Sequence, residues 1–151
     1  MDGSFERPPA LSGAAAILRG TGRLLRDMGE ACFAEFSLRT GRRVDLIGLG
    51  SDGTVTIVEV KSCVADYRSD RKWQEYLPFC DRFYFAVDAA FPQDLIPPEC
   101  GLIVADAYAA VVLRASAPGD MNPSRRRALT LKFARDGARR LHDLIDPGVP
   151  R

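Results

Sequence analysis

Three strand-like segments separated by two short turns constrain the fold more than any other feature of this chain. Residues 31–38, 43–50 and 54–61 are rich in Val, Ile, Leu and Phe, which favour strands. The turns at 39–41 and 51–53 each end in glycine, which suits a three-residue hairpin loop whose last residue is left-handed. The pattern therefore predicts an antiparallel meander of three strands.

Helical patterns precede and follow this meander. Apolar residues recur at roughly helical spacing from Ala10 to Met28, and Gly29 then ends the pattern. A second helix is expected to begin at Asp70 as its N-cap and to end before Pro78. The other expected elements are strands at 82–87, 101–105 and 109–114, a loop at 89–100 and a last helix at 123–144.

The order of these elements predicts an α/β fold with a central mixed sheet. The strand after the crossover helix can lie parallel beside the third strand of the meander. The third strand is apolar on both faces, with Val55 and Ile57 on one and Val58 and Val60 on the other, so helices should cover both. The expected boundaries are a flexible arm at 1–9, a single domain at 10–145 and a tail at 146–151.

Composition excludes several other classes of protein. Apolar residues at 46% and charged residues at 27% are typical of a soluble globular domain. No apolar run is long enough to span a membrane, and the N-terminal residues lack a secretory pattern, so a cytoplasmic protein is expected. The four cysteines form no Cys-x-x-Cys pair and His142 is the only histidine, so nothing indicates a structural zinc site.

Acidic residues fall in register on the three predicted strands. If each turn closes at the residues that flank it, Asp45 lies opposite Glu59, and Glu35 lies opposite Asp45. Directly opposed side chains on one face have Cβ atoms roughly 4.5 to 5.5 Å apart. Like charges at that distance need a proton or a cation. A hard divalent ion, Mg²⁺ or Mn²⁺, is the natural partner of such oxygen ligands.

Lys61 lies two residues beyond Glu59, so both side chains should project from the same face of one strand. An ammonium group there could orient a water nucleophile or neutralise charge that develops on a phosphate. The carbonyl of Val60 is a further candidate oxygen ligand. A Glu-x-Lys spacing is common by chance, and the alternative interpretation is an ordinary surface ion pair at a strand end.

Candidate nucleic-acid contacts follow the carboxylates along the chain. Lys72 and Gln74 could face the site and bind the scissile phosphate, and Trp73 and Tyr76 either stack on a base or pack in the core, which helical spacing favours. The basic last helix could contact phosphates, but its charge pattern alone favours a solvated face, and a net charge of +1 does not indicate nucleic acid. Its first arginines are Arg125, Arg126 and Arg127.

The spacing of these residues resembles a known superfamily. Asp45, followed fourteen positions later by Glu59-Val60-Lys61 on a helix–strand–strand–strand–helix–strand order, resembles the PD-(D/E)XK nucleases with the restriction-endonuclease-like fold. Val44 stands where the proline of that name would be, and the Gln-x-x-x-Tyr motif of the RecB-like branch is absent.

Longer segments look like the MmcB family, bacterial proteins described as DNA-repair endonucleases linked to mitomycin C damage. The resemblance implies a DNA substrate and a repair setting, and it supports Glu35 as part of the site. The segments that carry it are Glu35, Gly41–Asp45, Ile57–Ser62, Asp70–Trp73 with Tyr76, Cys80–Val87, Gly101–Asp106 and Ala138–Leu141.

Together these features predict a Mg²⁺- or Mn²⁺-dependent DNA endonuclease that hydrolyses phosphodiester bonds with a metal-activated water. The expected ligands are Asp45, Glu59 and the Val60 carbonyl, with Glu35 as a third acidic ligand or a base. Lys61 positions water or stabilises charge. The expected DNA contacts are Arg43, Lys72, Gln74, Arg125, Arg126 and Arg127. The alternative is a catalytically weak or inactive DNA-binding subunit of a repair complex, and a homodimer or a repair-protein partner is compatible with either.

Overall fold

The computed structural model of the chain describes residues 11, 13–70 and 72–148. The arm expected at residues 1–9 lies outside the described residues, as do residues 149–151 of the expected tail. No described helix is long and apolar enough to cross a membrane. The elements are α1 (Gly13–Asp27), β1 (Ala31–Ser37), β2 (Arg43–Leu49), β3 (Val55–Val60), α2 (Val64–Ser69), the 3₁₀ helix η1 (Trp73–Phe79), β4 (Arg82–Val87), the 3₁₀ helix η2 (Gln93–Leu95), β5 (Gly101–Ala105), β6 (Ala110–Arg114) and α3 (Pro123–Ile145).

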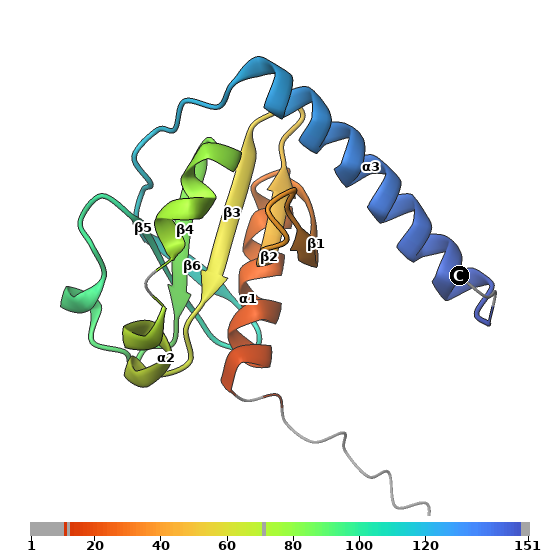
Figure 1. The fold of residues 1–151 in the computed structure, drawn as a ribbon. Coiled ribbons are helices and arrows are strands. Elements are labelled where there is room, and N and C mark those ends of the chain that lie inside the picture. The colour runs from red at the N-terminus through yellow and green to blue at the C-terminus, as the bar shows by residue number, and fades with distance from the viewer. Residues whose placement is uncertain (1–10, 12, 71, 149–151) are drawn as a thin grey trace, which may run out of the picture.

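Six strands form one mixed sheet in the order β1-β2-β3-β4-β5-β6 (Figure 1). The first three strands are antiparallel, β3, β4 and β5 run parallel, and β6 returns antiparallel to β5. Both turn glycines adopt the expected left-handed backbone, since φ is 85° at Gly41 and at Gly53. Their amides donate to the carbonyls of Leu38 and Gly50, which closes the two hairpins in the predicted register. The predicted mixed α/β sheet is therefore confirmed.

Helices cover both faces of the sheet, as the apolar alternation in β3 predicts. On one face, Ile17 and Leu25 of α1 pack against Leu46, Val58 and Ile103. The other face carries an aromatic core beneath η1 and the start of α3.

Two aromatic residues of η1 belong to that core. Trp73 stacks on Phe83 with ring centroids 5.8 Å apart, and Tyr76 stacks on the same ring at 6.2 Å. The interpretation of Trp73 and Tyr76 as core residues is confirmed, and neither ring is free to stack on a nucleic-acid base.

The crossover between β3 and β4 differs from the single helix expected after Asp70. The helix α2 instead ends before Asp70, which is its C-cap in an extended conformation with φ −88° and ψ 102°. A separate 3₁₀ helix, η1, then begins at Trp73 and contains Pro78. Between the two helices, the Asp70 carboxylate accepts the Lys72 amide and pairs with Lys61, nine residues earlier in the chain.

Candidate active site

The backbone pairing of β2 with β3 ends at Leu46 and Val58. Beyond this pair, acidic side chains accept the backbone amides of the facing strand. The Val60 amide donates to Asp45 Oδ2 at 2.8 Å, and the Asp45 amide donates to Glu59 Oε1 at 3.1 Å. The predicted register thus brings Asp45 and Glu59 together. Each carboxylate satisfies a backbone amide of the facing strand, and its second oxygen takes no part in these two bonds.

Burial makes this pair of carboxylates electrostatically unfavourable when both are ionised. Glu59 is only 5% exposed, and burial together with the negative charge of Asp45 raises its pKa to about 8. Burial also raises the pKa of Asp45, against the opposing effect of the hydrogen bond from Val60. The pair therefore holds a proton near neutral pH unless a cation takes its place.

Lys61 supplies a positive charge at the same end of the sheet. Its amide donates to the Ala86 carbonyl at 3.0 Å, which ties the end of β3 to β4. Its Nζ lies 2.7 Å from Asp70 Oδ2, and both side chains are largely buried. The charge of Lys61 lowers the pKa of both Asp45 and Glu59, in opposition to burial.

Asp70 is a member of the site that the sequence reasoning missed. Hydrogen bonding and the charge of Lys61 outweigh burial and lower the pKa of Asp70, so it stays ionised. It anchors Lys61 from the crossover segment, and its negative charge also acts on Asp45 and Glu59. The one signal in the sequence was an acidic residue nine positions after Lys61, and the N-cap interpretation concealed it.

Tyr76 and two arginines complete the surroundings of the carboxylates. Burial, followed by the charges of Glu59, Asp70 and Asp45, raises the pKa of Tyr76 to about 12. Arg43 is exposed, and its charge lowers the pKa of Asp45. Arg42 pairs with Glu75 of η1. The predicted DNA contact Arg43 therefore lies near the site with its side chain open to solvent.

Glu35 forms no ladder pair with Asp45, and among the described residues it joins no group of three acids that could hold a metal ion, so the expected row of three carboxylates is not found. Its backbone is left-handed, with φ 59°, and its side chain is exposed. The pairs on either side keep the predicted register, but Glu35 and Asp45 form no pair. Its carbonyl accepts a hydrogen bond from Arg140 of α3. The left-handed residue interrupts the alternation of β1, so Phe33 and Phe36 meet edge to face within the same core.

The remaining donors suit a divalent cation that is bound by few protein ligands. Within the described residues, no three His, Cys, Asp or Glu side chains are grouped to hold a metal ion. Asp45 and Glu59 offer carboxylates, and the Val60 carbonyl points to the same edge as the Val60 amide, as in any antiparallel strand. Mg²⁺ is commonly held by one or two carboxylates, with water and substrate phosphate completing its shell. The donor set has that composition.

Two of the three helix arginines predicted to bind DNA have contacts within the protein. Arg126 makes two 2.6 Å contacts with the Asp81 carboxylate and donates to the Gly53 carbonyl at 2.8 Å. Arg125 lies over the Phe79 ring, with its guanidinium carbon 4.9 Å from the ring centre. Arg127, Lys72 and Gln74 have exposed side chains. The Lys72 backbone amide donates to Asp70 Oδ1 at 3.0 Å, but among the described residues none of the three side chains has a hydrogen bond to Asp45 or Glu59.

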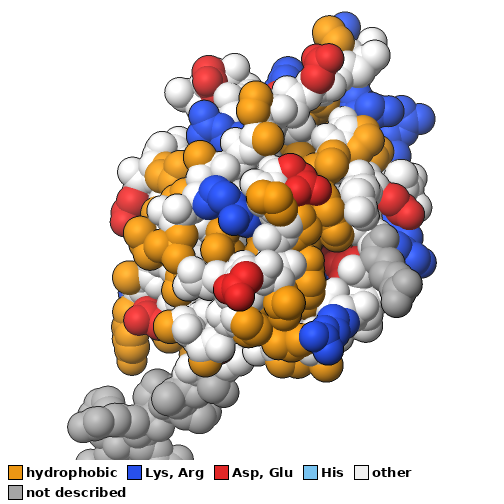
Figure 2. Space-filling model, turned by 90° about the vertical axis from the view of Figure 1, so that its left-hand side faces the viewer, with side chains coloured by type: hydrophobic (Ala, Val, Ile, Leu, Met, Phe, Trp, Pro, Cys, Tyr) orange, Lys and Arg blue, Asp and Glu red, His pale blue; other side chains and the backbone are white. Residues whose placement is uncertain are grey.

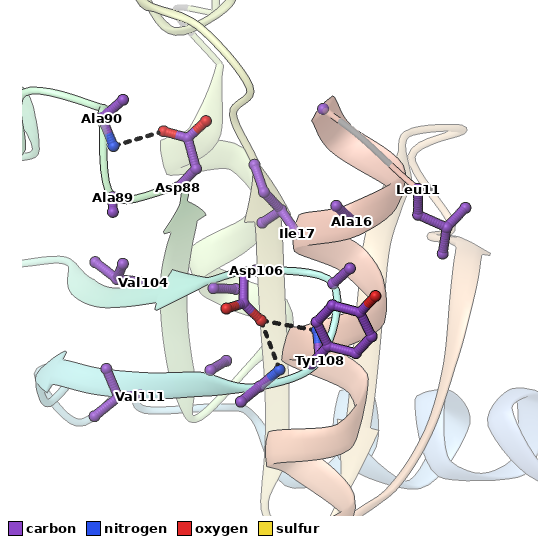
Figure 3. Close-up of a pocket in the computed structure, with 15 residues that line it drawn as sticks. Leu11, Ala16, Ile17, Asp88, Ala89, Ala90, Val104, Asp106, Tyr108 and Val111 are labelled. Carbon is purple, nitrogen blue, oxygen red and sulfur yellow. Dashed lines mark hydrogen bonds between the residues drawn. The ribbon is translucent and has the colours of Figure 1, made fainter. Parts of the chain in front are cut away.

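A large pocket lies away from Asp45 and Glu59. It has a volume of about 750 Å³ and is formed by the start of α1 and the β5–β6 hairpin (Figure 3). Its lining is mostly Ala and Val. The Oδ1 atom of Asp106 accepts the amides of Tyr108 and Ala109, and that of Asp88 accepts the Ala90 amide. Both carboxylates thus accept backbone amides of turns.

Charges are mixed on the face that Figure 2 shows. Acidic and basic side chains of the described residues alternate there among hydrophobic ones, without one patch of a single sign. This agrees with the net charge of +1. Any contact with DNA on this face would rest on a few side chains rather than on a broad basic surface.

Comparison with known proteins gives one family and one structural relative. The sequence model of the family described as "DNA repair protein MmcB-like" matches residues 9–148. A solved structure, described as "SPO1766 protein of unknown function from Silicibacter pomeroyi", is 43% identical and superposes with a TM-score of 0.89, over 93% of this chain and 99% of that chain. No protein with a curated description matches the chain.

Proposed function

Because the chain belongs to the family of MmcB-like DNA repair proteins, we propose that it is a divalent-metal-dependent DNA endonuclease that acts in repair. The observation that carries the proposal is the convergence of Asp45, Glu59 and Lys61 where β2 and β3 separate. A buried and a half-buried carboxylate that repel each other when both are ionised disfavour folding. That cost is understandable if they hold a cation during catalysis.

The residues of the site divide the work of phosphodiester hydrolysis. A divalent cation held by Asp45, Glu59 and the Val60 carbonyl would supply a Lewis acid for the scissile phosphate and lower the pKa of a water nucleophile. Lys61 would orient that water or neutralise charge on the phosphate, and its amine is fixed for this by Asp70 at 2.7 Å.

DNA would be held near these groups by exposed basic side chains. Arg43 lies beside Asp45 and is open to solvent, so it suits a contact to the phosphate backbone. Lys72 and Arg127 are exposed and are further candidates.

A DNA-binding subunit without turnover is the second candidate function. The net charge of +1 and the mixed charge of the face in Figure 2 favour it, because a partner protein would then supply part of the affinity for DNA. The pair formed by Asp45 and Glu59 argues against this function, because DNA binding alone does not require two neighbouring carboxylates that repel each other. The two functions differ in one observable property, metal-dependent cleavage.

The test is a cleavage assay on duplex, single-stranded and branched DNA with Mg²⁺ or Mn²⁺. We expect the wild type to cut at least one substrate, and Asp45→Ala and Lys61→Ala each to lower the rate by at least about 100-fold. Asp94→Ala, at an exposed carboxylate of η2, is the matched control and should cut like the wild type. A wild type that binds DNA but cuts none of the panel with either metal would overturn the proposal in favour of the binding subunit.

A further inference from the structure

One face of α3 carries a continuous apolar stripe that nothing in the described chain covers. Its members are separated by three and four residues in alternation, which is the spacing of a helix that packs along another helix. The large side chains are well exposed, with Leu131 at 62%, Leu141 at 58% and Ile145 at 73%. The stripe consists of Leu131, Ala134, Ala138, Leu141 and Ile145, and all five are exposed.

The opposite face of α3 fixes the direction in which this stripe points. Leu129 and Phe133 are buried in the aromatic core. The guanidinium carbon of Arg140 lies 4.6 Å from the centre of the Phe33 ring, and Lys132 Nζ lies 4.4 Å from that of Phe36. Beyond these contacts α3 extends past the sheet (Figure 1). The apolar stripe is therefore held on the outer side of a docked helix.

Charge is distributed unevenly on the two flanks of the stripe. At 100° per residue, Arg135, Arg139 and His142 fall on one flank, and Thr130 and Gly137 fall on the other. The acids of this segment, Asp136 and Asp143, fall on the side of the helix opposite Ala138, and Asp136 pairs with Lys132 at 2.5 Å and with the half-exposed Arg139 at 3.6 Å. One flank is thus basic, the other is neutral, and neither is acidic.

This distribution selects among the possible occupants. If a second copy of α3 packed antiparallel on the stripe, the basic flanks of the two helices would face each other. The repulsion between their cationic side chains, Arg135 among them, disfavours this arrangement. A parallel copy would set the cations against the neutral flank and place no acidic side chain opposite them. The apolar centre of the stripe does not suit a phosphate backbone. An acidic amphipathic helix satisfies both the stripe and its basic flank.

We propose that α3 is a docking surface for an acidic amphipathic helix of another protein. Leu or Ile side chains of that helix pack against Leu131, Leu141 and Ile145, and its Asp or Glu side chains lie opposite Arg135 and Arg139. The partner is defined by this chemistry, and the docking surface uses none of Asp45, Glu59, Lys61 and Asp70.

The test uses the full-length protein and two synthetic helical peptides of about three heptads. Both carry Leu at the stripe positions, and the flanking positions are Glu in one peptide and Lys in the other. Fluorescence anisotropy at low salt should show the Glu peptide binding at least about tenfold more tightly than the Lys peptide, with the difference reduced at high salt.

Variants separate this docking surface from unspecific adhesion. Leu141→Asp should weaken binding of the Glu peptide by at least about tenfold, whereas Leu113→Asp, at an exposed Leu on β6, should leave it unchanged. The double variant Arg135→Glu, Arg139→Glu should reverse the preference toward the Lys peptide. Equal binding of both peptides, or of neither, would overturn the proposal. Dimerisation in sedimentation that Leu141→Asp abolishes would also overturn it, because the occupant is then a second copy.

Discussion

Replacing Glu59 by Gln should stabilise the metal-free protein at alkaline pH while it removes activity. Glu59 is almost fully buried, and burial with the charge of Asp45 raises its pKa from 4.5 to about 8. A glutamine has nearly the same shape and keeps an oxygen that accepts the Asp45 amide. The variant therefore removes the charge and retains the hydrogen bond.

The size of the effect follows from the pKa shift. Because the pKa of Glu59 is higher in the folded than in the unfolded chain, the folded state holds this proton more tightly. Its contribution to stability is fully present below pH 4.5 and is lost as the pH rises through about 8. One pKa unit corresponds to about 1.4 kcal/mol, so the free energy of unfolding should fall by roughly 3 to 5 kcal/mol over this range. Glu59→Gln lacks that loss.

The assay is urea denaturation in EDTA at about pH 5 and about pH 8.5, with wild type and variant compared at each pH so that other titrating groups cancel. The difference in unfolding free energy should be small at the lower pH and reach roughly 3 to 5 kcal/mol in favour of Glu59→Gln at the higher one. Asp94→Asn, at an exposed carboxylate, is the control and should match the wild type. A variant that is less stable than the wild type at about pH 8.5 would refute the reasoning.

Three further results are expected. Binding of Mg²⁺ or Mn²⁺ near pH 7 should release a proton from the wild type but none from Glu59→Gln. Calorimetry in two buffers of different ionisation enthalpy measures this release, and equal release from both proteins would contradict the raised pKa of Glu59. Asp70→Asn should lower the cleavage rate by about tenfold or more with little change in KM, because Lys61 loses its ion pair with the Asp70 carboxylate at 2.7 Å. A change in KM alone would assign Asp70 to DNA binding instead. Arg126→Ala should lower the free energy of unfolding by about 1 to 3 kcal/mol in denaturant melts, because Asp81 loses both of its guanidinium contacts. Unchanged stability together with weakened DNA binding would instead support the phosphate contact that the sequence predicts for Arg126.

The sheet and the central carboxylate pair could be predicted because both follow from local rules. Glycines at 41 and 53 fix the two hairpin loops, and a fixed loop fixes the register of every residue behind it. Once that register is set, Asp45 and Glu59 must face each other across β2 and β3, and Lys61 follows by strand alternation.

The parts that could not be predicted depend on contacts far apart in sequence. Asp is a residue type that favours the N-cap position, so the sequence predicts that Asp70 begins a helix. In the structure it is the C-cap of α2 and pairs with Lys61. Glu35 adopts a left-handed conformation that no local signal announces in a residue other than glycine or asparagine. Arg126 looks like a solvent-exposed helix residue until Asp81 is brought beside it by the fold.

The measurement that tests the central claim most directly is the rate of DNA cleavage in Mn²⁺ by wild type and Glu59→Gln under single-turnover conditions. We predict that the variant, although at least as stable as the wild type at about pH 8, cuts at least about 100-fold more slowly, because the site loses one of its two carboxylates. Equal rates in the two proteins would show that the carboxylate pair between β2 and β3 is not the catalytic centre.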